Sequence, residues 1–201
     1  ERHDFDVTEL GYQVYIHALP QENTSLIYGR GLMATAFISH GMPNSAHFFC
    51  KGVSSSVEVD VNCYSRELRE LSEVLESDAK PVYYFSSVAV NKLKDYSVYY
   101  AHKYQIEKLV VATGRGRIVR LPQVVGKSGN RYNLLNFFID SLRSGSTLML
   151  NKLAVRNFVK ATDIARILAS LHGEDLLWKS NGGILELSSP FNFNAIKIAK
   201  L

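Results

Sequence analysis

The sequence is poor in cysteine and has no long apolar run. Two cysteines, Cys50 and Cys63, among 201 residues are too few for a disulfide framework or a four-cysteine zinc site. No window approaches the roughly 18 consecutive apolar residues of a membrane span, and no basic-then-apolar amino terminus indicates a signal peptide. These absences predict a protein of the reducing cytoplasm that does not bind membranes.

The net charge is also small. A net charge of +4 is too mild to favour nucleic acid as a partner, although it suits a ligand that carries phosphates. The basic stretch 115–117 is best explained as a turn between a helix and a strand. The six histidines are scattered, and none is paired with Cys, Asp or Glu at metal-site spacing, so we predict no metal. The sequence also lacks the G-x-S-x-G elbow of α/β hydrolases.

Short apolar segments alternate with amphipathic segments through most of the chain. This order is typical of an open α/β fold with a mainly parallel sheet. The predicted strands cover 12–16, 25–28, 46–50, 82–85, 118–121, 147–150, 155–159 and 184–187. The predicted helices cover 32–39, 63–77, 98–112 and 134–142. Two more are expected, one capped by Thr162 or Asp163 and one running from a cap at Asn194 to Leu201.

A glycine turn stands where the strand 25–28 meets the helix that follows it. Gly29, Gly31 and Ala34 form a G-x-G-x-x-A pattern. Gly29 permits a tight turn, Gly31 lets the backbone approach a pyrophosphate, and Ala34 allows close helix–strand packing. The helix amino terminus supplies free N–H groups and a favourable dipole for the anion. A glycine-rich turn without a ligand is the alternative, because this pattern alone is weak.

A candidate catalytic group follows in the middle of the chain. Tyr99 and Lys103 lie four residues apart on one face of a predicted helix. Ser86 and Ser87 follow the strand 82–85, at the end that faces the ligand crevice of open α/β sheets. A tyrosine whose pKa is lowered by an ammonium can exchange a proton with a carbonyl or alcohol oxygen. The alternative is that Tyr99 packs in the core and Lys103 is a solvated charge.

In their order, these motifs resemble those of the extended short-chain dehydrogenase/reductase family. Within it, the likeness is to NAD(P)-dependent nucleotide-sugar epimerases, dehydratases and reductases. The matching stretches are 29–34, 85–90, 99–103 with 107–109, 119–126 and 156–165. The resemblance implies a shortened Rossmann-like, doubly wound fold in a single α/β domain, 1–201. That domain would combine a reduced dinucleotide-binding core, about 25–125, with a small substrate-binding part, about 126–201, interleaved with it.

The resemblance also implies roles for individual residues. Ser87 would polarise the substrate oxygen, Tyr99 would be the acid/base, and Lys103 would lower the pKa of Tyr99 and bind the nicotinamide ribose. Arg156 would reach the diphosphate of a nucleotide sugar, for which a planar bidentate donor is suited. The cofactor, NAD or NADP, would contact Gly29, Gly31, Leu32, Met33, Ala34, Lys51, Ser86 and Pro122.

The reaction implied is epimerisation or ketone reduction by hydride transfer. Dehydratases of this branch carry an acidic pair directly after the catalytic Ser or Thr, where this sequence has Val88 and Ala89. Dehydration is therefore disfavoured. A reduced, weakly active or inactive relative that acts as a binding or assembly protein is the alternative.

The chain departs from the family where the adenosine should bind. Only positions 35–46 separate Ala34 from His47. If 46–50 is the second strand, Lys51 stands at its end in place of an acidic residue and favours the 2′-phosphate of NADP. If 47–53 is instead the fourth strand, the distances to Ser87 fit the family, and the second and third strands are missing. We prefer this second alignment.

The helices 63–77 and 98–112 correspond to those that often form a homodimer in the family. Leu68, Leu71 and Leu75 fall on one face of the first helix and suit either such an interface or the core.

Overall fold

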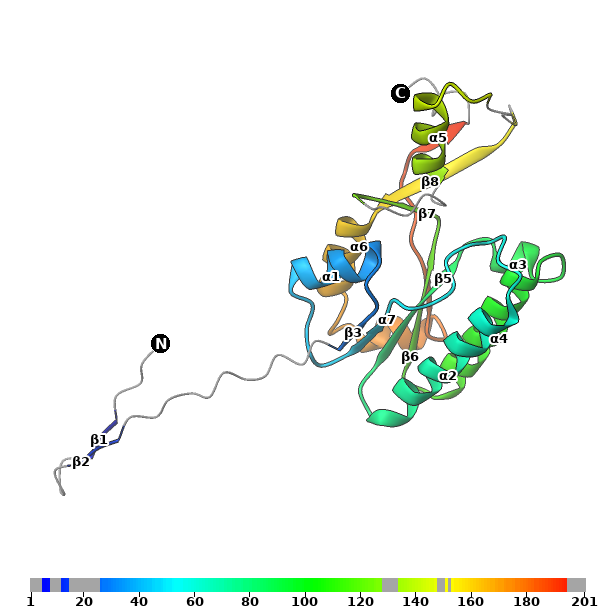
Figure 1. Cartoon of the computed structure of the whole chain (residues 1–201). Helices are drawn as coiled ribbons and strands as arrows, with labels where there is room; N and C mark the ends of the chain where they lie inside the picture. The colour runs from blue at the N-terminus through cyan, green and yellow to red at the C-terminus, as the bar shows by residue number, and fades with distance from the viewer. Residues whose placement is uncertain are drawn as a thin grey trace.

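The computed structural model describes residues 26–127, 134–147, 151 and 153–194, and the backbone of two short strands near the amino terminus. Its centre is a five-stranded sheet in the order β3-β4-β5-β6-β9, in which every neighbouring pair is parallel (Figure 1). The strands are β3 (Ile27–Tyr28), β4 (His47–Phe49), β5 (Val82–Ser87), β6 (Gly116–Leu121) and β9 (Ile184–Glu186).

Helices cover both faces of this sheet. On one face α1 (Leu32–His40) packs beside α6 (Ala161–Ser170), and on the other α2 (Val61–Ser77) packs beside α4 (Val98–Ala112) (Figure 1). Each face has its own apolar core. Successive residues of β5 serve opposite faces, so Tyr83 packs with the α1 and α6 side and Tyr84 with the α2 and α4 side. The expected Rossmann-like, doubly wound fold is confirmed.

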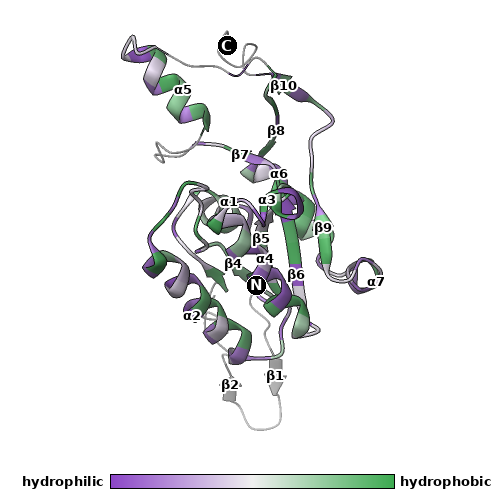
Figure 2. Ribbon diagram, turned by 90° about the vertical axis from the view of Figure 1, so that its right-hand side faces the viewer, coloured by the Kyte–Doolittle hydropathy of each residue, from purple (hydrophilic) through white to green (hydrophobic). Residues whose placement is uncertain are grey.

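A smaller region lies at one end of the molecule (Figures 1 and 2). It contains a three-stranded sheet in the order β10-β8-β7 and one helix. These elements are β7 (Gln123–Val125), α5 (Leu134–Arg143), β8 (Val155–Lys160) and β10 (Asn192–Asn194). Because β8 runs directly into α6 on the main sheet, the chain passes back and forth between the two regions.

The strand order decides between the two alignments of the sequence. Strand β4 lies between β3 and β5 and pairs with both. In the doubly wound order, a second strand would lie on the far side of β3, away from β5. Strand β4 therefore holds the place of the fourth strand, as preferred. Among the described residues β3 pairs only with β4, so it forms one edge of the described sheet.

Several local predictions differ from the structure. Helix α6 begins at Ala161 after Lys160, so Thr162 and Asp163 lie in its first turn and do not cap it. Asp163 instead lies 3.7 Å from Arg166. The sequence pattern did not predict four short elements: α3 (Val90–Leu93), α7 (Asp175–Ser180), β7 and β10.

Other predictions concern residues at the limits of what is described. The strand at 12–16 is confirmed in part as β2 (Tyr12–Val14), which pairs antiparallel with an unexpected β1 (Phe5–Val7). The strand at 147–150 and the helix at 194–201 lie almost wholly outside the described residues. No helix in the described part of the chain combines the length and the hydropathy that crossing a membrane requires.

Candidate active site

The glycine turn is built as its sequence predicts. Gly29 has φ +125°, and a Cβ there would lie 2.8 Å from the backbone oxygen of Cys50, so only glycine fits. Gly31 is the N-cap of α1, offers no side-chain cap, and has open space where a Cβ would stand. The first N–H groups of a helix have no partner within it. This turn therefore leaves donors and space for an anion, while Ala34 is fully buried.

Two serines end β5 at the carboxyl edge of the sheet. The Ser87 hydroxyl accepts a hydrogen bond from the backbone N–H of Ala89 at 3.2 Å and is partly exposed. The Ser86 hydroxyl is buried and has no hydrogen-bond partner in the structure. Buried hydroxyls are almost always paired, so Ser86 is a polar group for which a bound molecule would supply a partner.

Tyr99 and Lys103 both lie on α4, which packs against β5. The Lys103 ammonium lies 5.7 Å from the centre of the Tyr99 ring. Lys103 is only 2% exposed, which rules out a solvated surface lysine. Its Nζ donates to Glu67 at 2.8 Å and to the Tyr84 hydroxyl at 2.9 Å. The lysine is therefore held on the inner side of α4 by side chains from α2 and β5.

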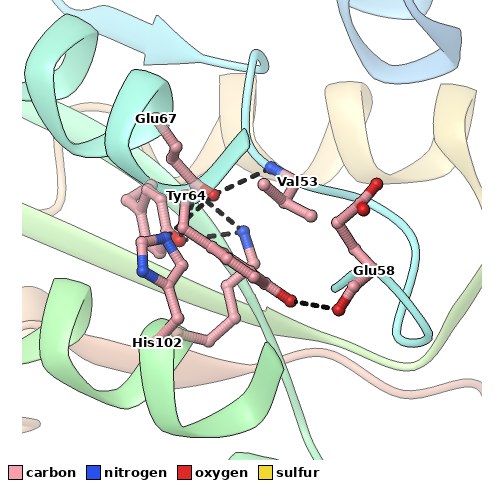
Figure 3. A network of polar contacts seen from close by, with 7 residues as sticks. Val53, Glu58, Tyr64, Glu67 and His102 are labelled. Carbon is pink, nitrogen blue, oxygen red and sulfur yellow. Dashed lines mark hydrogen bonds and ion pairs between the residues drawn. The ribbon is translucent and has the colours of Figure 1, made fainter. Parts of the chain in front are cut away.

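Glu67 on α2 is the centre of this network (Figure 3). Besides Lys103, its carboxylate accepts hydrogen bonds from Tyr84 at 2.6 Å, His102 at 3.1 Å and the backbone N–H of Val53 at 2.8 Å. The sequence alone did not predict a role for Glu67. The available signal was its position, since Glu67 lies three residues after Tyr64 on the buried face of the helix.

The hydrogen bonds and charges around Glu67 determine the protonation of Glu67, Lys103 and Tyr99. Burial alone would raise the pKa of Glu67, but attraction by Lys103 and the hydrogen bonds from His102, Lys103 and Tyr84 hold it at about 2. Burial lowers the pKa of Lys103, and the charge of Glu67 opposes that shift. The expected lowering of the Tyr99 pKa by Lys103 is not found: burial raises that pKa, and the charges of Tyr100 and Glu67 raise it further. At neutral pH the Tyr99 phenol thus carries its proton.

A second buried ion pair fixes the position of α4. The Arg120 guanidinium on β6 donates to both carboxylate oxygens of Glu107, at 3.0 and 2.7 Å, and to Glu186 at 3.1 Å. Arg120 and Glu107 are both buried. Bidentate pairs of this kind constrain geometry strongly, so the pair ties the helix of Tyr99 and Lys103 to the middle of the sheet.

The remaining site candidates lie apart from these contacts. Lys51 pairs with Glu70 at 2.8 Å beside a cavity of about 270 Å³ that Tyr28 also lines. Pro122 occupies the bend between β6 and β7. Arg156 is exposed on β8 and donates to the neighbouring carbonyl of Val155. Leu32 and Met33 open α1 beside the glycine turn and pack against the core. In the described part of the chain, no three His, Cys, Asp or Glu side chains gather as metal ligands.

Solved structures with a similar fold include enzymes named for nucleotide sugars and a protein in complex with one. The protein MoeE5 in complex with UDP-glucose and NAD is 13% identical, with a TM-score of 0.62 over 87% of this chain and 78% of that one. UDP-galactose 4-epimerase is 16% identical, with a TM-score of 0.61 over 85% of this chain and 65% of that one. The dTDP-glucose 4,6-dehydratase of Bacillus anthracis in complex with NAD is 11% identical, with a TM-score of 0.57 over 85% and 61%.

The chain spans less than two thirds of the epimerase and dehydratase chains. No protein-family model matches the sequence, and no curated protein does so either. At these identities the likeness shows the fold: this chain has the Rossmann-like fold of those dehydratase and epimerase structures.

Proposed function

We propose that this chain is an NAD(P)-dependent oxidoreductase or epimerase that acts on a nucleotide sugar through Ser87, Tyr99 and Lys103. The observation that carries this proposal is the placement of Tyr99 and Lys103 on one helix, packed against the strand that ends in Ser87. The fold in which they lie is shared with structures solved in complex with NAD and a nucleotide sugar.

The residues around the glycine turn fit the diphosphate of the cofactor. The open space above Gly31 and the uncapped start of α1 provide room and N–H donors for the anion. The unpaired hydroxyl of Ser86 would hydrogen-bond to the cofactor or substrate. For the adenosine, the described residues offer the edge strand β3 and the cavity that Tyr28 and Lys51 line. The cofactor would supply hydride exchange: its oxidised form would take a hydride from a carbinol carbon and return it in epimerisation, and its reduced form would give a hydride to a ketone carbon in reduction.

The protein side chains would manage the accompanying proton. In ketone reduction the Tyr99 phenol would donate its proton to the substrate oxygen, and in oxidation of a carbinol the Tyr99 phenolate would accept the proton of the substrate hydroxyl. The Ser87 hydroxyl would hydrogen-bond to the same oxygen. The Lys103 ammonium would stabilise the tyrosinate that remains, since an adjacent positive charge favours the ionised phenol. Without an acidic pair at Val88 and Ala89, the site has no additional acid and base for eliminating water there. The proposal is therefore epimerisation or ketone reduction.

A second function is favoured by how tightly Lys103 is enclosed. Its ammonium is occupied by Glu67 and Tyr84, and a Cβ on Gly52 would stand 2.8 Å from Nζ. A buried ion pair of this kind can serve the fold alone. In that case the chain is a reduced relative of these enzymes that binds or assembles with a partner and has no turnover.

Cofactor binding and a Tyr99 variant test the enzymatic proposal. NADH and NADPH should quench the fluorescence of the protein or raise its melting temperature, and a panel of UDP- and dTDP-sugars should show turnover. Tyr99→Phe should abolish turnover while the protein stays folded. Tyr96→Phe is the matched control, because Tyr96 is 84% exposed and lies on the same stretch. No binding at millimolar cofactor would reject the enzyme and leave the binding protein.

The proposal includes a homodimer formed through α2 and α4, which light scattering tests. Leu71 and Leu75 are buried in the core of a single chain, whereas Leu68 is 44% exposed and is available to a partner. Light scattering on the eluting peak should give the mass of two chains, and Leu68→Glu should shift it to one.

A further inference from the structure

The loop between β4 and α2 connects the glycine turn with Lys103. At one end, the backbone of Cys50 lies so close to Gly29 that no Cβ fits between them. At the other end, the backbone N–H of Val53 donates to Glu67. Between them, Gly52 lies directly over the Lys103–Glu67 pair. The loop 50–53 therefore touches both the proposed diphosphate site and the proposed catalytic lysine.

The hydrogen bonds between Lys103, Glu67 and their neighbours leave one N–H donor of the Lys103 ammonium unused. A carboxylate has about four acceptor positions, and Glu67 uses its two oxygens for four partners. An ammonium has three N–H donors, and the contacts of Lys103 engage two of them, with Glu67 and Tyr84. One N–H is thus left for the ribose hydroxyl that the proposed function requires.

Resting on the proposed function, we propose that Glu67 is the positioning residue for Lys103. It keeps the buried ammonium charged, aims the remaining N–H, and ties that ammonium to the loop that supports the glycine turn. Glu67 would thereby couple the diphosphate end of the cofactor site to its catalytic end.

Among the groups around Lys103, Glu67 is the one that compensates the charge of the ammonium. The ionisable groups around the ammonium come from α2, β5 and α4: Tyr64, Glu67, Tyr84, Tyr99, His102 and Glu107. Of the two carboxylates, Glu107 is engaged by Arg120 through both oxygens. Of these two carboxylates, Glu67 is the one that contacts the ammonium. Without its charge, a buried ammonium is uncompensated and loses its proton.

The pH profile of cofactor binding tests this role. For Glu67→Gln, we expect NADH binding to weaken above neutral pH and to recover as the pH falls, because acid restores the proton on Lys103. The midpoint of that loss should lie on the order of 1–3 pH units below the wild-type midpoint. Glu67→Asp keeps the charge and should restore most of the profile. Glu76→Gln, an exposed change on the same helix, should match the wild type.

A second readout follows Lys103 without any cofactor. Lysine labelled with ¹³C at Cε reports its own titration by NMR, and Lys103→Met assigns the signal. Its midpoint should fall in Glu67→Gln and stay near the wild-type value in Glu67→Asp. If Glu67→Gln does not fold, Glu67→Asp against Glu76→Gln still measures the effect of moving the carboxylate.

The outcomes separate the two proposals. If the wild type binds NADH and Glu67→Gln keeps the same pH profile, the positioning role is wrong and the proposed function stands. If the wild type binds neither NADH nor NADPH, the proposed function is wrong and the positioning role toward the cofactor falls with it. In that case the NMR titration alone decides whether Glu67 sets the charge of Lys103.

Discussion

The acid sensitivity of the fold follows from the buried Glu67–Lys103 pair. The pKa of Glu67 is held at about 2 in the folded protein, against 4.5 for a free side chain. A group whose folded pKa is depressed contributes stability above its unfolded pKa and loses it as the pH falls toward the folded value. At 1.36 kcal/mol per pH unit, this difference amounts to about 3 kcal/mol of unfolding free energy. It is present in full above pH 5 and nearly gone at pH 2.

Urea unfolding at a series of pH values measures this contribution. Trp178, the only tryptophan, is buried and gives a fluorescence signal. Between pH 5 and pH 2 the stability of the wild type should fall by about 3 kcal/mol more than that of Glu67→Gln. Asp78, whose pKa is lowered mainly by its hydrogen bond from His47, contributes equally to both proteins and cancels. Parallel curves would show that the carboxylate is not held as the structure indicates.

Three further substitutions probe the elements around the site. Gly29→Ala should lower the melting temperature by several degrees and abolish NADH binding, because its φ and the nearby backbone oxygen exclude a side chain; an unchanged melting curve would contradict this. Leu71→Ala should cost about 2–5 kcal/mol in urea unfolding, whereas the exposed Leu68→Ala should stay within about 0.5 kcal/mol; similar losses would place the core elsewhere. Tyr84→Phe removes the hydroxyl that joins Glu67 to Lys103 and should cost about 1.5–3 kcal/mol with an unchanged m-value.

The sequence predicted those parts of the fold that depend on local pattern. Periodic apolar residues located α2 and α4 within two residues of their ends, and the glycine spacing located the turn before α1. Short elements such as α3 carry too few residues to show a period. The start of α6 was misplaced because Thr162 and Asp163 are good capping residues, yet β8 runs straight into the helix and leaves Lys160 at the N-cap.

The partner of Lys103 lay beyond the reach of local pattern. A helical pattern predicts that charged residues of an amphipathic helix face solvent, and Glu67 breaks that rule. Its burial depends on α2 and α4 lying side by side over β5, so that a carboxylate, an ammonium and a phenol from three elements meet. The spacing of α2 places Glu67 on the same face as Tyr64 and Leu71, but it does not show which side chains of other elements meet the carboxylate there.

The two functions proposed for the chain make different demands on Tyr99. If the Lys103–Glu67 pair serves only the fold, the hydrogen bonds that matter are those of Lys103 to Glu67 and Tyr84. Removing the Tyr99 hydroxyl should then change the stability of the protein little. If Lys103 serves a reaction, the Tyr99 hydroxyl is the group that exchanges a proton with the substrate. Substitution of Tyr84 should reduce stability under either function, whereas substitution of Tyr99 should matter only to an enzyme. The contrast between these two tyrosines therefore distinguishes a catalytic lysine from a structural one.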